Sequence, residues 1–218
     1  MRDWDDTGVL RVGCSITIGS QLMPGYVKAF YKQKPGTEIL VHIDRSRQLE
    51  ERLLRGELDF ILIEGAAHDP NLISEEYLED SLAAVCAPGA PYQAGQQVSL
   101  EDFLSQPLLL REHGSGTREA LDSALEVQGF SAQPAWEGVS TAALVNAAAA
   151  GLGVAVVPRR MIAAPLEQGV VVDIRIAGLD LRRKLRIVYH RHKYLTSNAR
   201  DFLTLCRASA FSMGSPGQ

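Results

Sequence analysis

Small polar residues gather at four places in the chain, each directly after an apolar segment with strand character. The hydroxyl residues at these turns are Ser15 and Thr17, Ser46, Ser115 and Thr117, and Ser140 and Thr141. A helix is expected to begin at each turn, and the N–H groups and dipole of a helix start favour anions. Ser and Thr also cap helices for purely structural reasons, which would explain any single turn. All four together predict one shared binding cleft for a small, anionic ligand.

The segment 114–118, Gly-Ser-Gly-Thr-Arg, combines the most binding groups. Its glycines let a ligand approach the backbone closely, while its hydroxyls and guanidinium can donate hydrogen bonds. A nucleotide-phosphate loop is disfavoured because Gly-Lys-Ser/Thr is missing, and Gly151-Leu-Gly153 lies in the wrong order for a dinucleotide fingerprint. The residues expected to contact the ligand are Ser15, Ile16, Thr17, Ser46, Glu112, Gly114, Ser115, Gly116, Thr117, Arg118, Ser140 and Thr141.

Catalytic and metal sites are not expected. Neither Ser115 nor Ser140 lies in Gly-x-Ser-x-Gly. His190 and His192 are spaced to share one side of a strand. Polar side chains that face solvent explain them better than a metal pair. We therefore expect no catalytic residue, no metal and no cofactor. Arg111 and Glu112 either pair within their turn, or one of them faces the cleft.

The elements that position these turns form a repeated pattern. Residues 9–63 and residues 107–157 each alternate strand, helix, strand, helix and strand. In open α/β sheets ligands settle outside the carboxyl ends of the strands, where all four turns fall. Other expected elements are a polar turn at 15–20 before a helix at 20–34, a helix at 46–55, strands at 73–78 and 82–87, a short helix capped by Ser99, a strand at 170–176 and a closing helix at 196–208.

Bulk composition limits the class of protein. The 218 residues carry a formal net charge of −4 with no basic stripe, so the chain by itself does not resemble a nucleic-acid binder. Cys14, Cys86 and Cys206 are widely spaced, which favours reduced, buried thiols. The chain opens without an apolar leader, and its longest apolar stretch is too short for a membrane span. We therefore expect a cytoplasmic protein with no membrane partner.

Three segments carry a resemblance to a known family: residues 10–19, residues 53–63 and residues 151–158, Gly-Leu-Gly-Val-Ala-Val-Val-Pro. In their order and spacing they are similar to the effector-binding domain of LysR-type transcriptional regulators over about residues 8–208. Residues 110–118, together with 188–190 and 194–195, resemble the subfamily tied to sulfur assimilation and sulfite response.

The resemblance implies an α/β, two-lobed fold of the periplasmic-binding-protein type 2 class. Each lobe is a mixed sheet flanked by helices, and two crossovers join the lobes. Lobe I would comprise 1–78 and 184–209 and lobe II 79–183, with a disordered tail at 210–218. A small-molecule or oxyanion effector would bind between the lobes.

The family also implies partners. DNA would be contacted only through an N-terminal winged helix-turn-helix, which is absent from this chain because strand one is entered at about residue 9. A homodimer or tetramer is implied, with the helix at 20–34 and the segment 118–138 at the dimer face. The apolar residues of these two segments could equally belong to the hydrophobic core.

Two other functions fit the same scaffold. A solute-binding protein of a transport system would have the same lobes, but reduced cysteines favour a regulator. An enzyme of the dehydratase or deaminase type would need a positioned base, and only scattered Glu and His residues are present. We favour an effector sensor that is not an enzyme.

Overall fold

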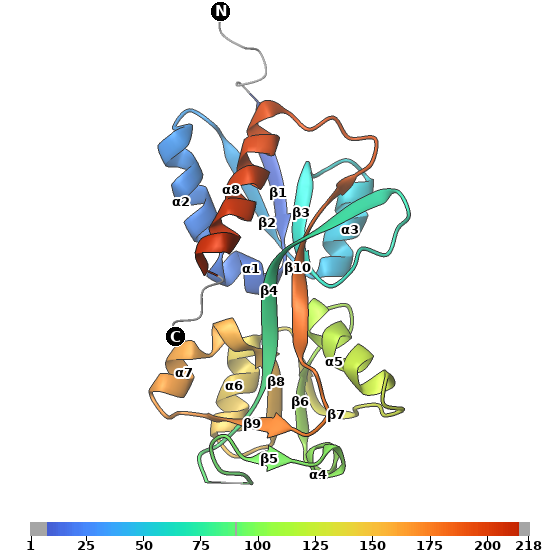
Figure 1. Ribbon diagram of the computed structural model, residues 1–218, viewed down its shortest axis with the longest axis vertical. Helices are drawn as coiled ribbons and strands as arrows, with labels where there is room; N and C mark the ends of the chain where they lie inside the picture. The colour runs from blue at the N-terminus through green and yellow to red at the C-terminus, as the bar shows by residue number, and fades with distance from the viewer. Residues whose placement is uncertain (1–7, 90, 214–218) are drawn as a thin grey trace, which may run out of the picture. The chain divides into compact units, whose positions relative to one another are not determined.

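A computed structural model describes residues 8–89 and 91–213, with side chains through residue 208. The chain divides into two units: unit 1 is Met1–Glu79 with Lys184–Gln218, and unit 2 is Asp80–Arg183. The first boundary therefore falls after Glu79, where the sequence led us to expect it after residue 78. Two strands, β4 (Leu72–Cys86) and β10 (Arg182–His190), belong in part to each unit and carry the chain from one to the other (Figure 1).

Unit 1 is a mixed sheet between helices. Its elements are β1 (Leu10–Cys14), α1 (Ile16–Gln21), α2 (Met23–Gln33), β2 (Ile39–Ile43), α3 (Ser46–Leu54), β3 (Phe60–Glu64) and α8 (Ser197–Met213). β1 pairs in parallel with β2 and β3, and β10 runs antiparallel to β3. In Figure 1, α2 and α8 lie to one side of the strands and α3 to the other. The ring of Phe202 on α8 packs 5.2 Å from that of Phe30 and 5.7 Å from that of Phe60, so apolar burial holds α8 on the sheet.

The expected polar turn at 15–20 is wrong, because these residues form helix α1. Ser15 is its N-cap, and the Ser15 hydroxyl oxygen accepts from the Ile18 N–H at 3.4 Å. α1 ends at Gln21, and Leu22 separates it from α2, which has Pro24 in its first turn, so the helix expected at 20–34 is divided between two helices. A Cβ on Gly19 would lie 2.8 Å from Ile43, which shows how closely α1 packs on β2.

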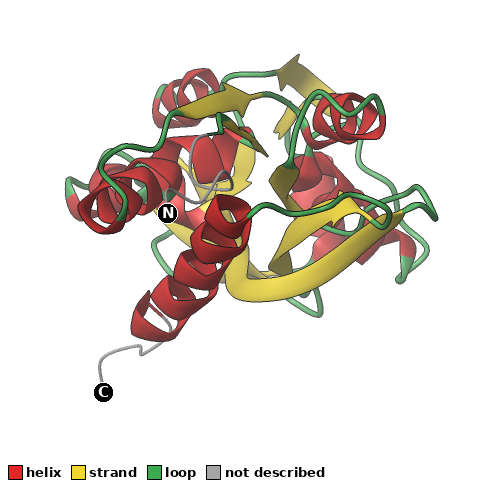
Figure 2. Ribbon diagram, turned by 90° about the horizontal axis from the view of Figure 1, so that it is seen from above, coloured by secondary structure: helices red, strands yellow, loops and turns green. Residues whose placement is uncertain are grey.

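Unit 2 repeats the layered arrangement. Its further elements are β5 (Gln97–Val98), α4 (Leu100–Ser105), β6 (Leu108–Arg111), α5 (Gly116–Glu126), β7 (Pro134–Gly138), α6 (Thr141–Ala149), β8 (Val154–Pro158), a 3₁₀ turn (Arg159–Met161), α7 (Ala163–Glu167) and β9 (Val172–Ile176). β6 pairs in parallel with β7 and β8, and β4 runs antiparallel to β8 and β9. Alternation along β6 sends Leu108 and Leu110 into the core with α5, and Leu109 into the core with α6. Figure 2 shows the strands in yellow among the helices in red.

Several other expectations need correction. The segments 73–78 and 82–87 are one continuous strand, β4, because the polar break between them includes Asp80, whose charge is satisfied inside unit 2. The 3₁₀ turn and α7 were not expected from the sequence. The Ser99 cap is confirmed, since its hydroxyl oxygen accepts from the Asp102 N–H at 3.0 Å. Residues 210–213, expected in a disordered tail, continue α8, and 214–218 lie outside the described residues.

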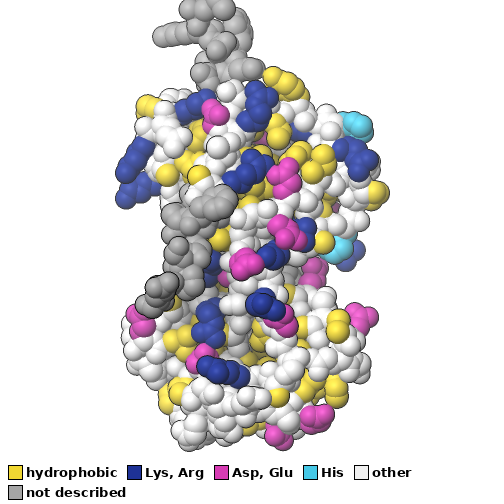
Figure 3. Space-filling view, viewed as in Figure 1, with side chains coloured by type: hydrophobic (Ala, Val, Ile, Leu, Met, Phe, Trp, Pro, Cys, Tyr) yellow, Lys and Arg dark blue, Asp and Glu magenta, His cyan; other side chains and the backbone are white. Residues whose placement is uncertain are grey.

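Charged side chains of both signs are interspersed on the face shown in Figure 3. Many form surface ion pairs, such as Arg186 with Glu76 at 2.6 Å. Within the described part of the chain, no helix has the length and apolar character needed to cross a membrane.

Candidate functional site

Buried polar residues lie at the carboxyl ends of the parallel strands in each unit. In unit 1 they are Ser15 after β1, Ser46 after β2 and Glu64 at the end of β3. The Glu64 carboxylate is 2% exposed and accepts from the Ser15 hydroxyl at 2.8 Å and the Ser46 hydroxyl at 3.4 Å. Both hydroxyl protons are thus used within unit 1, and what remains at these atoms are acceptor lone pairs.

Glu64 was missed by the sequence analysis. It ends the otherwise apolar strand Phe-Ile-Leu-Ile-Glu, and a lone carboxylate at the carboxyl end of such a strand was the available signal. Its presence changes the chemistry expected of Ser15 and Ser46, because the strand ends of unit 1 carry a negative charge. Ser46 is the first residue of α3 rather than its cap, which is Arg45.

Thr17 differs from its two hydroxyl neighbours. The residue is 1% exposed, and its hydroxyl makes no hydrogen bond with the part of the chain that is described. Thr17 therefore keeps both its proton and its lone pairs available. Ile16, the first residue of α1, is partly exposed.

The three cysteines are free, buried thiols. Burial, together with the negative charge of Glu64, raises the pKa of Cys14 to about 12. Burial also raises the pKa of Cys86 and of Cys206. All three thiols are therefore protonated at neutral pH and poor nucleophiles.

In unit 2 the serines at two helix starts act as N-caps, which is the purely structural role that the sequence analysis considered for each turn. The Ser115 hydroxyl oxygen accepts from the Arg118 N–H at 3.1 Å, and that of Ser140 accepts from the Ala143 N–H at 3.2 Å. Capping satisfies only one N–H at each helix start. The N–H groups of Gly116 and Thr117 on α5, and those of the first two residues of α6, have no acceptor within residues 8–89 and 91–213. Gly114 has φ +83°, so the turn before α5 requires glycine there.

Arg111 is a buried guanidinium at the end of β6. Its Nε and Nη2 donate to the two carboxylate oxygens of Glu112 at 2.9 and 3.0 Å, so of the two alternatives the pairing within the turn is the one observed. Its Nη1 donates to the Thr141 hydroxyl oxygen at 3.3 Å. The contact follows from strand alternation, because Arg111 continues the face on which Leu109 meets α6.

Arg183 is a second buried guanidinium, on β10. Its Nε donates to Asp80 Oδ2 at 2.8 Å, and its Nη1 donates to the Thr117 hydroxyl oxygen at 3.1 Å. Asp80 Oδ1 accepts from Arg160 Nε at 3.0 Å. The sequence analysis missed Arg183 and Asp80, since they are 103 residues apart and only the fold brings them together.

Arg118, expected to supply charge to the ligand, lies elsewhere. Its Nε donates to both oxygens of Asp122 at 2.9 Å, and its Nη1 donates to Glu137 Oε2 at 3.4 Å. It lines a cavity of about 570 Å³ beside α5 and β7, together with His113, Asp122, Glu126, Phe130, Ser131, Ala132, Gln133, Pro134 and Glu137. The described residues contain no cluster of three or more His, Cys, Asp or Glu side chains able to hold a metal ion.

The fold defines the class: an α/β domain of two mixed-sheet units joined by two shared strands, with polar groups at the strand ends. A family model described as the LysR substrate binding domain matches residues 5–210. The chain belongs to this family.

Several of the similar proteins are named as transcriptional regulators. The chain is 33% identical over 202 residues to the uncharacterized HTH-type transcriptional regulator YeiE of Escherichia coli (strain K12), covering 93% of this chain and 69% of that protein. It is 26% identical over 202 residues to the HTH-type transcriptional regulator CysL of Bacillus subtilis (strain 168), covering 93% and 68%. The solved regulatory domain of Synechocystis PCC6803 CcmR, in complex with 2-PG, has the same fold with a TM-score of 0.85 at 20% identity, covering 94% and 99%.

These findings identify a ligand-sensing domain of a LysR-type transcriptional regulator. They favour a regulator over the transport alternative, and they give no support to an enzyme. They do not single out the sulfur-related subfamily, since the relatives also include the transcriptional activator CmpR and regulators of RuBisCO genes.

Proposed function

We propose that unit 2 binds a small anionic effector at the starts of α5 and α6, and that this binding is the signal the regulator senses. The observation that carries the proposal is the set of hydrogen-bond donors at these two helix starts. The first N–H groups of α5 and α6 have no acceptor within the described residues, and the buried hydroxyls of Thr117 and Thr141 each accept from an arginine. Helix-start N–H groups without acceptors favour an anion.

Unit 1 contributes differently in this proposal. The hydroxyls of Ser15 and Ser46 donate to Glu64, so we expect unit 1 to offer acceptors and the hydroxyl of Thr17. The shared cleft between the lobes stays a prediction, and so do the roles of Ser15, Ile16, Thr17 and Ser46 in binding.

Among anions we propose sulfur oxyanions first and small carboxylates second. The resemblance of residues 110–118 to the sulfur-related subfamily supports this order. The domain would bind its effector without turning it over, because the cluster offers no nucleophile paired with a base.

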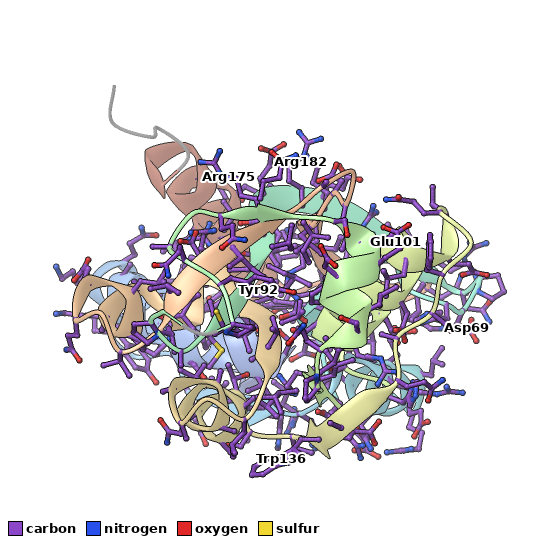
Figure 4. All side chains as sticks on the ribbon, turned by 90° about the horizontal axis from the view of Figure 1, so that it is seen from below. Asp69, Tyr92, Glu101, Trp136, Arg175 and Arg182 are labelled. Atoms are coloured by element: carbon purple, nitrogen blue, oxygen red, sulfur yellow. The ribbon has the colours of Figure 1, made fainter. Side chains whose placement is uncertain are left out.

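We propose that the domain acts as a homodimer or tetramer and reaches DNA through a helix-turn-helix elsewhere in the polypeptide, in the cytoplasm. The dimer is supported by exposed apolar residues in the two segments expected at its face. These residues are Tyr31, Val127 and Trp136, which are 40%, 89% and 48% exposed. Figure 4 shows Trp136 at the outer edge of the molecule, directed away from the core. The exposed face of α2 carries Lys28 and Lys32 and no acid, which complements the acidic cavity beside α5.

Thermal unfolding with a panel of sulfate, sulfite, acetate and succinate tests the anion proposal. An anion at a hundred times its Kd adds about 2.7 kcal/mol to the free energy of unfolding. For a chain of this length that raises Tm by about 5–11 °C. Absence of stabilisation by every anion of the panel contradicts the proposal.

Two alanine variants test the residues. Thr117→Ala and Ser15→Ala should each weaken the stabilisation while far-UV circular dichroism stays the same. Thr204→Ala is the matched control, since this threonine lies on the exposed side of α8 and, among the described residues, its hydroxyl donates only to the Arg200 carbonyl. Unchanged affinity in both site variants removes these residues from the site.

A further inference from the structure

Thr117 and Thr141 share an arrangement that no other pair of site residues has. The Thr117 hydroxyl oxygen is 3.1 Å from Arg183 Nη1, and the Thr141 hydroxyl oxygen is 3.3 Å from Arg111 Nη1. A guanidinium can only donate hydrogen bonds. Each threonine oxygen must therefore accept, which leaves its single proton pointing to another acceptor.

Neither hydroxyl proton has an acceptor in the described parts of unit 2. Both threonines are 3% exposed, so water does not freely solvate them. The Ser15 hydroxyl of unit 1 is the opposite case, because its proton goes to Glu64. Unit 2 thus presents two hydroxyl donors next to helix-start N–H groups that also lack acceptors.

The two guanidiniums are held firmly in this orientation. Glu112 binds Arg111 through both carboxylate oxygens, and Asp80 binds Arg183. The carboxylates of Glu112 and Asp80 are therefore engaged by arginine. The positive charge also polarises each hydroxyl and strengthens it as a donor.

We propose that Arg111 and Arg183 are positioning residues that fix Thr141 and Thr117 as donors, so that the site selects an oxyanion carrying no proton. The inference rests on the proposed function and specifies the chemistry of that same site. Sulfate meets the requirement. Hydrogenphosphate has the same charge and nearly the same size, but its P–OH proton needs an acceptor that this set of donors does not offer. A buried donor left without an acceptor costs about tenfold or more in affinity.

Calorimetric titration of the chain with sodium sulfate and with sodium hydrogenphosphate, at about pH 8 and equal ionic strength, tests the inference. Both ions are then dianions and differ by one proton. We expect sulfate to bind about tenfold or more tightly. Thr117→Val keeps the shape but removes the hydroxyl, and should lose most of the sulfate affinity. Thr117→Ser should restore it.

A double-mutant cycle tests whether Arg183 acts through Thr117. If it does, Arg183→Met and Thr117→Val each weaken sulfate binding, and the double variant binds about as weakly as the worse single variant. Arg182→Met is the matched control. It removes the same charge from the neighbouring residue, whose side chain is 83% exposed and paired with Asp180, and should leave the affinity unchanged.

The outcomes separate the two proposals. If neither ion binds the unaltered chain and no anion of the thermal panel stabilises it, the proposed anion site is wrong. If only a carboxylate of that panel binds, the anion site stands and the inference is wrong. If the ions bind with equal affinity, or if Thr117→Val keeps the sulfate preference, the anion site stands and the inference about the hydroxyl donors is wrong. Additive losses in the cycle exclude a positioning role for Arg183. If Arg183→Met does not fold, the Thr117→Val and Thr117→Ser pair decides, because neither change touches the ion pair with Asp80.

Discussion

Replacement of Asp80 by alanine should destabilise unit 2 more than any single change at its surface. The Asp80 side chain is 1% exposed and sits between Arg183, 3% exposed, and Arg160, 28% exposed. In Asp80→Ala, Arg160 can turn to solvent, but Arg183 stays buried without its counter-charge. Removing one partner of a buried ion pair costs about 3–5 kcal/mol. For a chain of this length the Tm should fall by about 6–20 °C.

Urea unfolding followed by circular dichroism measures the change in the free energy of unfolding. Asp180→Ala is the control, because the Asp180 and Arg182 side chains are 59% and 83% exposed and form a surface ion pair. Such a pair contributes about 0–1 kcal/mol. Figure 4 shows Arg182 at the periphery of the molecule.

The double variant Asp80→Ala/Arg183→Met tests whether Asp80 stabilises unit 2 by neutralising Arg183. Once the buried guanidinium is gone, the missing carboxylate matters less, so the double variant should be more stable than the sum of the two single losses predicts, by about 1–3 kcal/mol. A purely additive loss, or an Asp80→Ala variant as stable as Asp180→Ala, would refute the view that Asp80 is needed to neutralise Arg183.

Two further predictions follow from burial and backbone geometry. Gly153→Ala should cost at least about 3 kcal/mol, or prevent folding, because a Cβ there would lie 2.1 Å from the Pro107 carbonyl oxygen and φ is +154°. Gly25→Ala, with open space around it in α2, should be neutral or stabilising in the same urea assay. At about pH 8 a thiol-specific disulfide reagent should label Cys14, Cys86 and Cys206 only after denaturation, because burial raises their pKa values and bars access. Rapid labelling of the native chain would contradict this.

The layered fold was predictable because local sequence patterns specify most of its strands and helices. Apolar runs such as Phe60–Glu64 and amphipathic spacing such as that of α5 specify strands and helices directly. The missed elements are those in which tertiary contacts override local pattern. Glu79, Asp80 and Ser81 look like a break, yet β4 continues through them because Arg183 satisfies Asp80.

The helix starts at the candidate site were predictable from the sequence, but the hydrogen-bond partners of their hydroxyls were not. The turns after β1, β6 and β7 are visible in the sequence, since Ser15, Ser115 and Ser140 mark the helix starts. Which partner each hydroxyl has is set by residues far away in the chain. Glu64 is 49 positions from Ser15, and Arg183 is 66 positions from Thr117. Spacing alone could not show that the first hydroxyl donates while the second accepts.

A crystal structure of the chain soaked with selenate tests the central claim most directly, because selenium gives an anomalous signal that locates the anion. The account predicts a selenate within hydrogen-bond distance of the N–H groups of Gly116 and Thr117 and of the Thr117 hydroxyl. Selenate bound only elsewhere, such as in the cavity beside Arg118, would contradict it.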